Sequence, residues 1–139
     1  MFRRILVPTD FSVKSVAAVD VARDFAAQSG AAVILLHVIE TIEHVEFQEL
    51  KPFYDRLEES ARNHLKELSE TFVTKKLRVD QELIYGHRTQ QIVDFAMQNA
   101  VDLIIMASHR IDPKRPGQGW SSISYSVAIL SSCPVLLVK

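Results

Sequence analysis

Five short apolar runs alternate along the chain with segments in which apolar residues recur every three or four positions. The runs cover residues 5–7, 32–39, 77–85, 103–106 and 135–138. Runs of this length are typical of strands, and the periodic segments between them are typical of amphipathic helices. Strict alternation of strand and helix predicts an α/β fold on one parallel sheet. With 139 residues and no linker or internal repeat, we expect a single domain over residues 1–139.

Local signals mark where the helices begin and end. Ser12 is suited to cap the first helix, and Gly30 stands where a C-terminal glycine is common. Pro52 is tolerated best in a first turn, so the second helix should begin near Lys51. Apolar residues at helical spacing outline the third and fourth helices: Ile92, Val93, Ala96 and Ala100, then Ile123, Val127 and Leu130.

The third run differs from the others because its apolar and polar residues alternate. Alternation indicates one wet face, so this strand is expected at an edge of the sheet. The strand order 3-2-1-4-5 follows, with helices on both faces. Ligands of such sheets bind beyond the carboxyl ends of the strands, where the strand order reverses. The reversal lies between strands 1 and 4, so the segments 8–12 and 107–122 should form the binding site.

Composition excludes several other classes of protein. Lys and Arg number 16 against 17 Asp and Glu, and this balance argues against broad nucleic-acid binding. The single cysteine, Cys133, excludes a disulfide framework, and the five histidines lack metal-ligand spacing. Because no apolar run approaches the roughly 20 residues of a membrane span, we expect a cytoplasmic protein with no membrane partner.

The last apolar run would form the second edge of the sheet. It is uninterrupted: Val135, Leu136, Leu137 and Val138. Exposed apolar edges invite pairing and are normally masked by charge, proline or cover. A second copy of the chain would cover this edge and produce a two-fold homodimer. Cover by the protein's own helices is the alternative, and it would leave a monomer.

Four segments resemble the universal stress protein family. They are residues 5–12 (ILVPTDFS), 36–38 (LHV), 100–109 (AVDLIIMASH) and 133–138 (CPVLLV), and their order and separations span the whole chain. The resemblance implies a stress-response protein with the five-stranded Rossmann-like, adenine nucleotide alpha hydrolase-like fold. It also implies dimerisation through the last strand. One branch of the family binds ATP, and another lacks the nucleotide motif.

The ATP-binding branch carries a glycine motif that this chain has lost. Ala107, Arg110 and Ser121 stand at its three glycine positions, and Ser122 and Ser124 at and beyond its hydroxyl position. Glycine lets a backbone adopt positive φ and approach a phosphate closely. The loop still offers Gly119 and the cations Arg110, Lys114 and Arg115. An anion site at the N-terminus of the last helix therefore remains feasible.

The resemblance also implies an adenosine site. Pro8, Thr9, Asp10 and Val38 match the positions that surround the adenosine in ATP-binding relatives, and His109 lies in the same loop region. The implied ligands are ATP or AMP, with Mg²⁺ accompanying a triphosphate.

Each of these residues also has a purely structural interpretation. Asp10 suits a turn, the serines suit a helix N-cap, and the loop cations suit a solvated loop. His37, which interrupts a buried run, is interpreted as a hydrogen-bonded core histidine.

The chain has no Gly-x-Ser-x-Gly segment, no intact phosphate-binding loop and no paired-carboxylate signature. We therefore expect a non-enzymatic sensor or regulator that binds an adenine nucleotide and signals to an unknown protein partner. The alternative is a nucleotide-free interaction protein of the same fold. A weak ATPase is a third interpretation, with Asp10 as its only candidate base.

Overall fold

The computed structural model describes residues 2–110, 113–115 and 122–139. Along these residues five strands alternate with four α-helices, as the hydrophobic pattern predicts. The elements are β1 (Arg4–Pro8), α1 (Val13–Ser29), β2 (Ala32–Glu40), the 3₁₀ helix η1 (Phe47–Leu50), α2 (Lys51–Val73), β3 (Val79–Gly86), α3 (Arg88–Gln98), β4 (Leu103–Ala107), α4 (Ile123–Leu130) and β5 (Val135–Val138).

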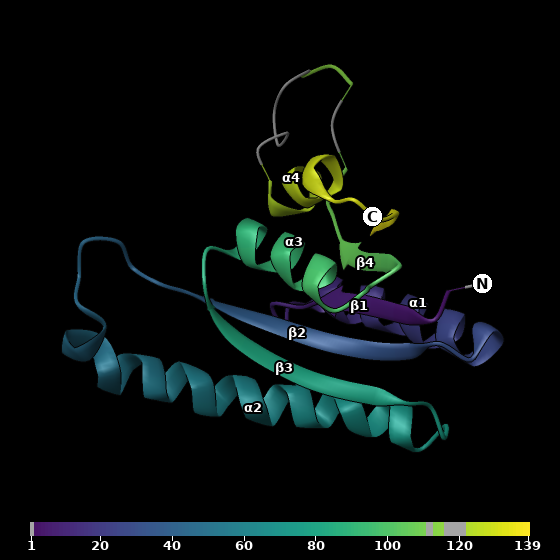
Figure 1. Ribbon diagram of the computed structural model, residues 1–139, viewed down its shortest axis with the longest axis horizontal. Coiled ribbons are helices and arrows are strands. Elements are labelled where there is room, and N and C mark those ends of the chain that lie inside the picture. Colours follow the sequence, from purple (N-terminus) through teal and green to yellow (C-terminus); the bar gives the residue numbers. More distant parts are fainter. Residues whose placement is uncertain (1, 111–112, 116–121) are drawn as a thin grey trace.

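The five strands form one parallel sheet in the order β3-β2-β1-β4-β5 (Figure 1). This confirms the predicted order and places the reversal between β1 and β4. The β1–β2 register runs from Arg4 opposite Ala32 to Pro8 opposite Leu36. The polar third strand lies at one edge and the apolar last strand at the other.

Helices cover both faces of the sheet, so two hydrophobic cores form. Successive side chains of a strand point to opposite faces. Ile5 and Val7 therefore join the core under α1 and α2, whereas Leu6 joins the core under α3 and α4. All three are completely buried. A buried strand of this kind must be apolar on both faces, which explains its unbroken apolar sequence.

The predicted helix ends of α1 are confirmed. The Ser12 side chain accepts a hydrogen bond from the Ser15 amide, as an N-cap does. Gly30 ends the helix with φ +74°, and its amide donates to the Ala26 carbonyl. This left-handed conformation suits glycine because no Cβ clashes with the backbone.

One helix boundary was predicted wrongly. We expected Ala100 in the third helix, but α3 ends at Gln98 and Ala100 adopts φ +52°. The amide of Val101 then donates to the Ala96 carbonyl at 3.0 Å, which closes the helix end and turns the chain into β4. Apolar spacing alone does not report this turn, because Ala100 continues the helical periodicity.

The 40–50 connection contains η1 and leads into α2 at Lys51, with Pro52 in the first turn as predicted. No helix of the described residues is both long and apolar enough to cross a membrane.

Candidate functional site

A cleft of about 260 Å³ lies over the carboxyl ends of the strands, where the strand order reverses. Eight of the predicted site residues line it: Pro8, Thr9, Asp10, Val38, Ala107, His109, Ser122 and Ser124. Arg110 is exposed and is not among the lining residues. Gly119 and Ser121 lie outside the described residues. The fold thus brings together segments that are more than 100 residues apart.

Asp10 is held by the loop that follows β1. The Ser12 amide donates to Asp10 Oδ1 at 2.9 Å, and the Ser15 hydroxyl donates to the same oxygen. Partial burial works to raise the pKa of Asp10, but the hydrogen bonds from Ser12 and Ser15 and the charge of Arg88 outweigh it. The pKa therefore lies below its usual value, and the carboxylate is ionised at neutral pH.

The second carboxylate oxygen of Asp10, Oδ2, has no hydrogen-bond partner among the described residues. Asp10 therefore has the local role of a turn residue and still presents an anionic acceptor at the cleft. The two interpretations of Asp10 are compatible.

The next residue is conformationally unusual. Phe11 adopts φ +66°, which costs a non-glycine residue free energy and is often found beside binding sites. Its amide donates to the Thr9 hydroxyl at 3.1 Å. Its ring packs between His37 at 4.5 Å and His64 at 4.7 Å, measured between ring centroids. These contacts fix the loop that carries Asp10.

Val38 contributes its main chain to the cleft. Thr9 donates its amide hydrogen to the Leu36 carbonyl at 2.9 Å, just after the β1–β2 register ends at Pro8. In a parallel sheet, residues two apart direct their N–H and C=O groups to the same side. Those of Val38 therefore point past the end of β1.

If the β1–β2 ladder continued, the Val38 amide would donate to the Thr9 carbonyl. The His37 ring donates to this carbonyl instead. His37 Nδ1 lies 2.8 Å from the Thr9 oxygen, so this nitrogen carries the proton and donates. No bond from β1 to Val38 is present among the described residues. An N–H donor and a C=O acceptor thus stand side by side at the cleft, and neither has a partner in the described part of the chain.

His37 itself was only partly predicted. It is hydrogen-bonded, as expected, but it is half-buried and lines the cleft rather than lying in the core. Burial is the main cause that lowers its pKa, reinforced by Arg88 and His64 and opposed by the Thr9 carbonyl and Asp10. The ring is therefore neutral at pH 7, and Nε2 is available as an acceptor.

Three serine hydroxyls connect β4 to α4. Ser108 Oγ lies 2.9 Å from Ser124 Oγ, which lies 3.2 Å from Ser122 Oγ. Ser122 also caps α4, because its side chain accepts from the Tyr125 amide at 3.4 Å. The capping interpretation is therefore confirmed for Ser122, and the N-terminus of α4 opens onto the cleft.

Two described residues stand where ATP-binding relatives have glycine, and neither has the positive φ that favours glycine. The residues with positive φ in the described chain do not include Ala107 or Arg110. Ala107 is the last residue of β4 and lies opposite Val138 of β5. The loss of glycine at these two positions therefore causes no backbone strain.

Two cations of the cleft were not predicted. Lys14 lies in the first turn of α1, and Arg88 begins α3. Arg88 and Ile92 share one helix face and both line the cleft. The sequence did contain a signal for both cations: the helix that follows a strand of a parallel sheet begins at the edge where ligands bind.

The described residues contain no group of three or more His, Cys, Asp or Glu side chains placed to hold a metal ion.

Comparison with known proteins gives a consistent result. A sequence model described as the Universal stress protein family matches residues 1–139. Universal stress protein MJ0577 of Methanocaldococcus jannaschii is 30% identical over 161 aligned positions, covering 100% of this chain and 96% of the relative. The solved structure of MJ0577 superposes with a TM-score of 0.81, with 30% identity and the same coverage of both chains.

Two further solved structures share the fold. A universal stress protein in complex with cAMP has a TM-score of 0.72 at 21% identity, covering 99% of this chain and 97% of that one. The universal stress protein of Archaeoglobus fulgidus in complex with dAMP has a TM-score of 0.70 at 15% identity, covering 100% and 98%.

Proposed function

The chain belongs to the universal stress protein family, and from this premise we propose that it is a homodimeric binding module whose cleft takes an adenine nucleotide. In this proposal the nucleotide is a signal that the protein senses. The cleft at the strand-order reversal is the site, and the exposed edge of β5 is the dimer interface.

The observation that carries the proposal is the unpartnered N–H and C=O pair of Val38 at the cleft. Adenine presents a donor, its 6-amino group, beside the acceptor ring nitrogen N1 on its Watson–Crick edge. The Val38 carbonyl is suited to accept from the amino group while the Val38 amide donates to the ring nitrogen. Leu36, Ile92 and Met106 supply the apolar surroundings that a base requires.

Asp10 is suited to the sugar. Its free oxygen Oδ2 is an ionised acceptor, and hydrogen bonds to charged groups contribute more than neutral ones, about 1.5–3 kcal/mol. A ribose hydroxyl that donates to it would be held beside the base site of Val38. Pro8 and Thr9 form the adjoining wall.

The phosphates belong at the N-terminus of α4. Free amide groups and the helix dipole favour an anion there, and the Ser122 and Ser124 hydroxyls lie at the same place. Lys14 adds a positive charge to the cleft. A triphosphate would bring Mg²⁺ held mainly by its own phosphate oxygens, as is usual for this ion.

The two complexed neighbours support the choice of ligand. Their ligands, cAMP and dAMP, share an adenine base and a phosphate, and differ in the sugar and in whether the phosphate is cyclised onto it. A site that reads the base through the backbone of β2 fits both.

The dimer is proposed from the edge of the sheet. The β5 side chains are each partly exposed in the single chain, although they pack into both cores: Val135, Leu136, Leu137 and Val138. Ile129 and Leu130 of α4 are exposed nearby in sequence, at 79% and 58%. A second β5 would cover the unpaired strand edge.

A nucleotide-free interaction protein is the second candidate, and Ala107 and Arg110 favour it. Both add side-chain atoms at positions where ATP-binding relatives have glycine. If these atoms close the phosphate site, only the dimer surface would remain functional.

Calorimetric titration with ATP and with AMP, each with and without Mg²⁺, separates the two candidates. We expect binding, and we expect Asp10→Asn to weaken it about tenfold or more because a charged acceptor is lost. Asp24→Asn is the matched control, since Asp24 is an exposed carboxylate of α1 outside the cleft. The absence of both heat and a thermal shift at millimolar nucleotide would reject nucleotide binding.

A further inference from the structure

The connection from β2 to α2 and the first turns of α2 carry exposed apolar side chains outside the cleft. They belong to five residues, which we call the 42–57 patch: Ile42, Val45, Phe47, Phe53 and Leu57. Ile42 is 48% exposed and the others are 38–40% exposed. Monomeric proteins rarely leave large apolar side chains grouped in this way unless they bind something.

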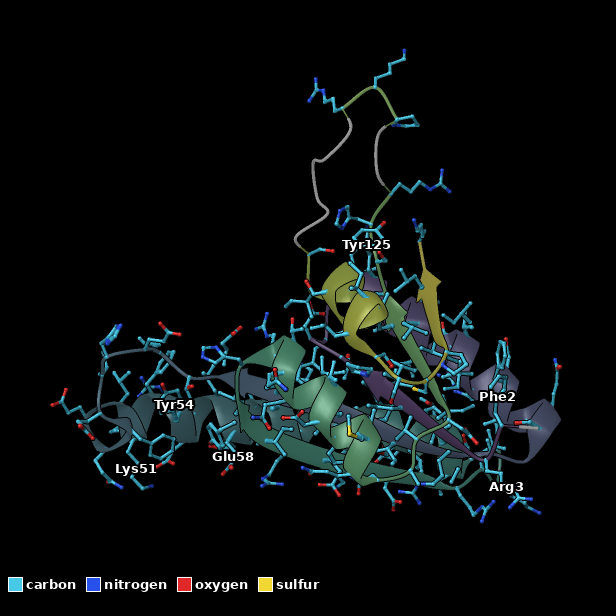
Figure 2. The ribbon with its side chains drawn as sticks, turned by 45° about the horizontal axis from the view of Figure 1, so that its top comes forward. Phe2, Arg3, Lys51, Tyr54, Glu58 and Tyr125 are labelled. Carbon is cyan, nitrogen blue, oxygen red and sulfur yellow. The ribbon has the colours of Figure 1, made fainter. Side chains whose placement is uncertain are left out.

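The 42–57 patch is organised around one buried ring, that of Tyr54. Tyr54 is 1% exposed, and its ring stacks on Phe47 at 4.8 Å and lies 5.6 Å from that of Phe53. Its hydroxyl accepts a hydrogen bond from the Ile42 amide at 2.9 Å. Residues from the connection and from α2 thus meet on a shared support. Figure 2 marks Lys51, Tyr54 and Glu58 in this part of α2.

Neighbouring contacts make the patch rigid. Phe53 and Leu57 lie one turn apart on the same face of α2. The Tyr85 ring of β3 packs edge-on against Phe47 at 5.4 Å, and its hydroxyl donates to Glu58 at 3.3 Å. A preorganised aromatic surface loses little conformational entropy when a partner binds.

Charge around the patch specifies the partner. Residues 40–59 contain seven carboxylates and two cations: Glu40, Glu43, Glu46, Glu49, Asp55, Glu58 and Glu59 against Lys51 and Arg56. The whole chain has a net charge of only -1, so this negative charge is local.

Some of these carboxylates are already paired. Lys51 bonds Asp55 at 2.8 Å, and His87 lies 3.2 Å from Glu43 and 3.5 Å from Glu40. Glu46 and Glu49 are exposed and have no ion pair among the described residues. They are available to a cationic partner.

We propose that the 42–57 patch is the docking surface for a basic amphipathic helix of a partner protein. Such a helix has an apolar stripe flanked by Lys and Arg, which complements aromatic residues flanked by glutamates. A second copy of the chain fits poorly, because a two-fold interface would bring the same carboxylates together. An anionic membrane would be repelled for the same reason.

Fluorescence anisotropy with labelled synthetic peptides tests the proposal on the full chain. The probe is a 14-residue Lys/Leu peptide with its leucines on one helical face. Its controls are the same peptide with Glu for Lys, and a scrambled peptide that has no apolar face. We expect the Lys/Leu peptide to bind at least tenfold more tightly than either control, and its affinity to fall with added salt.

Variants of the chain locate the binding surface. We expect Phe53→Ser to weaken binding about tenfold, and Met97→Ser, at an exposed apolar residue of α3 away from the patch, to leave it unchanged. Glu46→Gln with Glu49→Gln should weaken binding and flatten the salt dependence. Glu67→Gln with Glu70→Gln, on exposed positions later in α2, is the charge control. Circular dichroism confirms that each variant is folded.

Three results would overturn the proposal. The first is equal binding of the Lys/Leu and control peptides, or no binding of any. The second is an equal loss of affinity in the patch variants and in their controls. The third is a dimer in sedimentation that Phe53→Ser converts to monomer, which would assign the patch to a second copy of the chain.

Discussion

Thr9 donates its amide hydrogen to the Leu36 carbonyl at 2.9 Å, and no β1 bond beyond this one reaches β2 among the described residues. The Thr9 carbonyl would be the next to pair, but it accepts from the His37 ring at 2.8 Å. Within residues 2–110, 113–115 and 122–139, no group pairs with the Val38 amide or carbonyl at the cleft. The proposed recognition of adenine follows from this interruption of the ladder.

Ser122 allows capping and ligand binding to be measured separately. Ser122→Ala removes the side chain that accepts from the Tyr125 amide, and should lower the free energy of unfolding by about 1 kcal/mol. Ser122→Asp keeps the cap but places a negative charge at the proposed phosphate site. We expect near-wild-type stability in urea and weaker ATP binding by calorimetry. Undiminished ATP affinity in Ser122→Asp would place the phosphates elsewhere.

Asp10 should contribute to stability in a pH-dependent way. Its pKa is lowered from the usual 3.8, so its contribution is complete above that pH and is lost as pH falls through the folded-state pKa. The stability difference between the natural chain and Asp10→Asn should therefore shrink in acid. Urea unfolding at neutral pH and near pH 3 measures it. A difference that is constant or grows in acid would contradict the assignment.

His37, unlike Asp10, carries its charge when protonated, and its pKa is also lowered. The neutral ring therefore stabilises the fold fully above the ordinary value of 6.5, and this contribution declines as pH falls below it. We expect His37→Gln to lose this part of the dependence of the melting temperature on pH. His44→Gln, at an exposed position, is the control and should keep it. Identical pH profiles for His37→Gln and the natural chain would refute the prediction.

The two described glycines with positive φ should respond differently to alanine. At Gly30 a Cβ would meet no atom within 4 Å, so Gly30→Ala carries only the left-handed backbone cost, about 1–2 kcal/mol. At Gly86, with φ +141°, a Cβ would come within 2.8 Å of the Gln91 side chain. We expect Gly86→Ala to be more destabilising in urea unfolding.

The double variant with Gln91→Ala distinguishes the two causes at Gly86. It should recover the part of the lost stability that comes from the contact with the Gln91 side chain. The part that comes from the backbone conformation at residue 86 should remain lost. Full recovery would show that the backbone conformation at Gly86 is not strained by alanine.

The fold could be predicted because its determinants are local or periodic. The alternating third run placed β3 at an edge, and Ser12 and Gly30 marked the ends of α1. The position of the cleft then followed from the strand order alone. Ala100 was misassigned because a left-handed turn at a helix end leaves no mark on apolar spacing.

The details of the site could be predicted only in part, because they depend on contacts between distant segments. The apolar run around His37 indicates burial, but not that the ring would take the carbonyl of Thr9, 28 residues away. Arg88 reaches the cleft from a helix that carries none of the quoted family segments. The 42–57 patch arises from packing on Tyr54, which links a segment without clear periodicity to α2.

The central claim, that the main chain of Val38 reads an adenine base, is tested most directly by comparing AMP with IMP in calorimetric titration. The two nucleotides share the sugar and phosphate, but hypoxanthine has an acceptor oxygen where adenine has its amino donor, and a donor N–H at N1, where adenine has an acceptor. In the same pose both bonds to Val38 would be lost and two polar groups left unpaired. We predict that AMP binds at least tenfold more tightly than IMP, whereas equal affinities, or binding of neither, would contradict the claim.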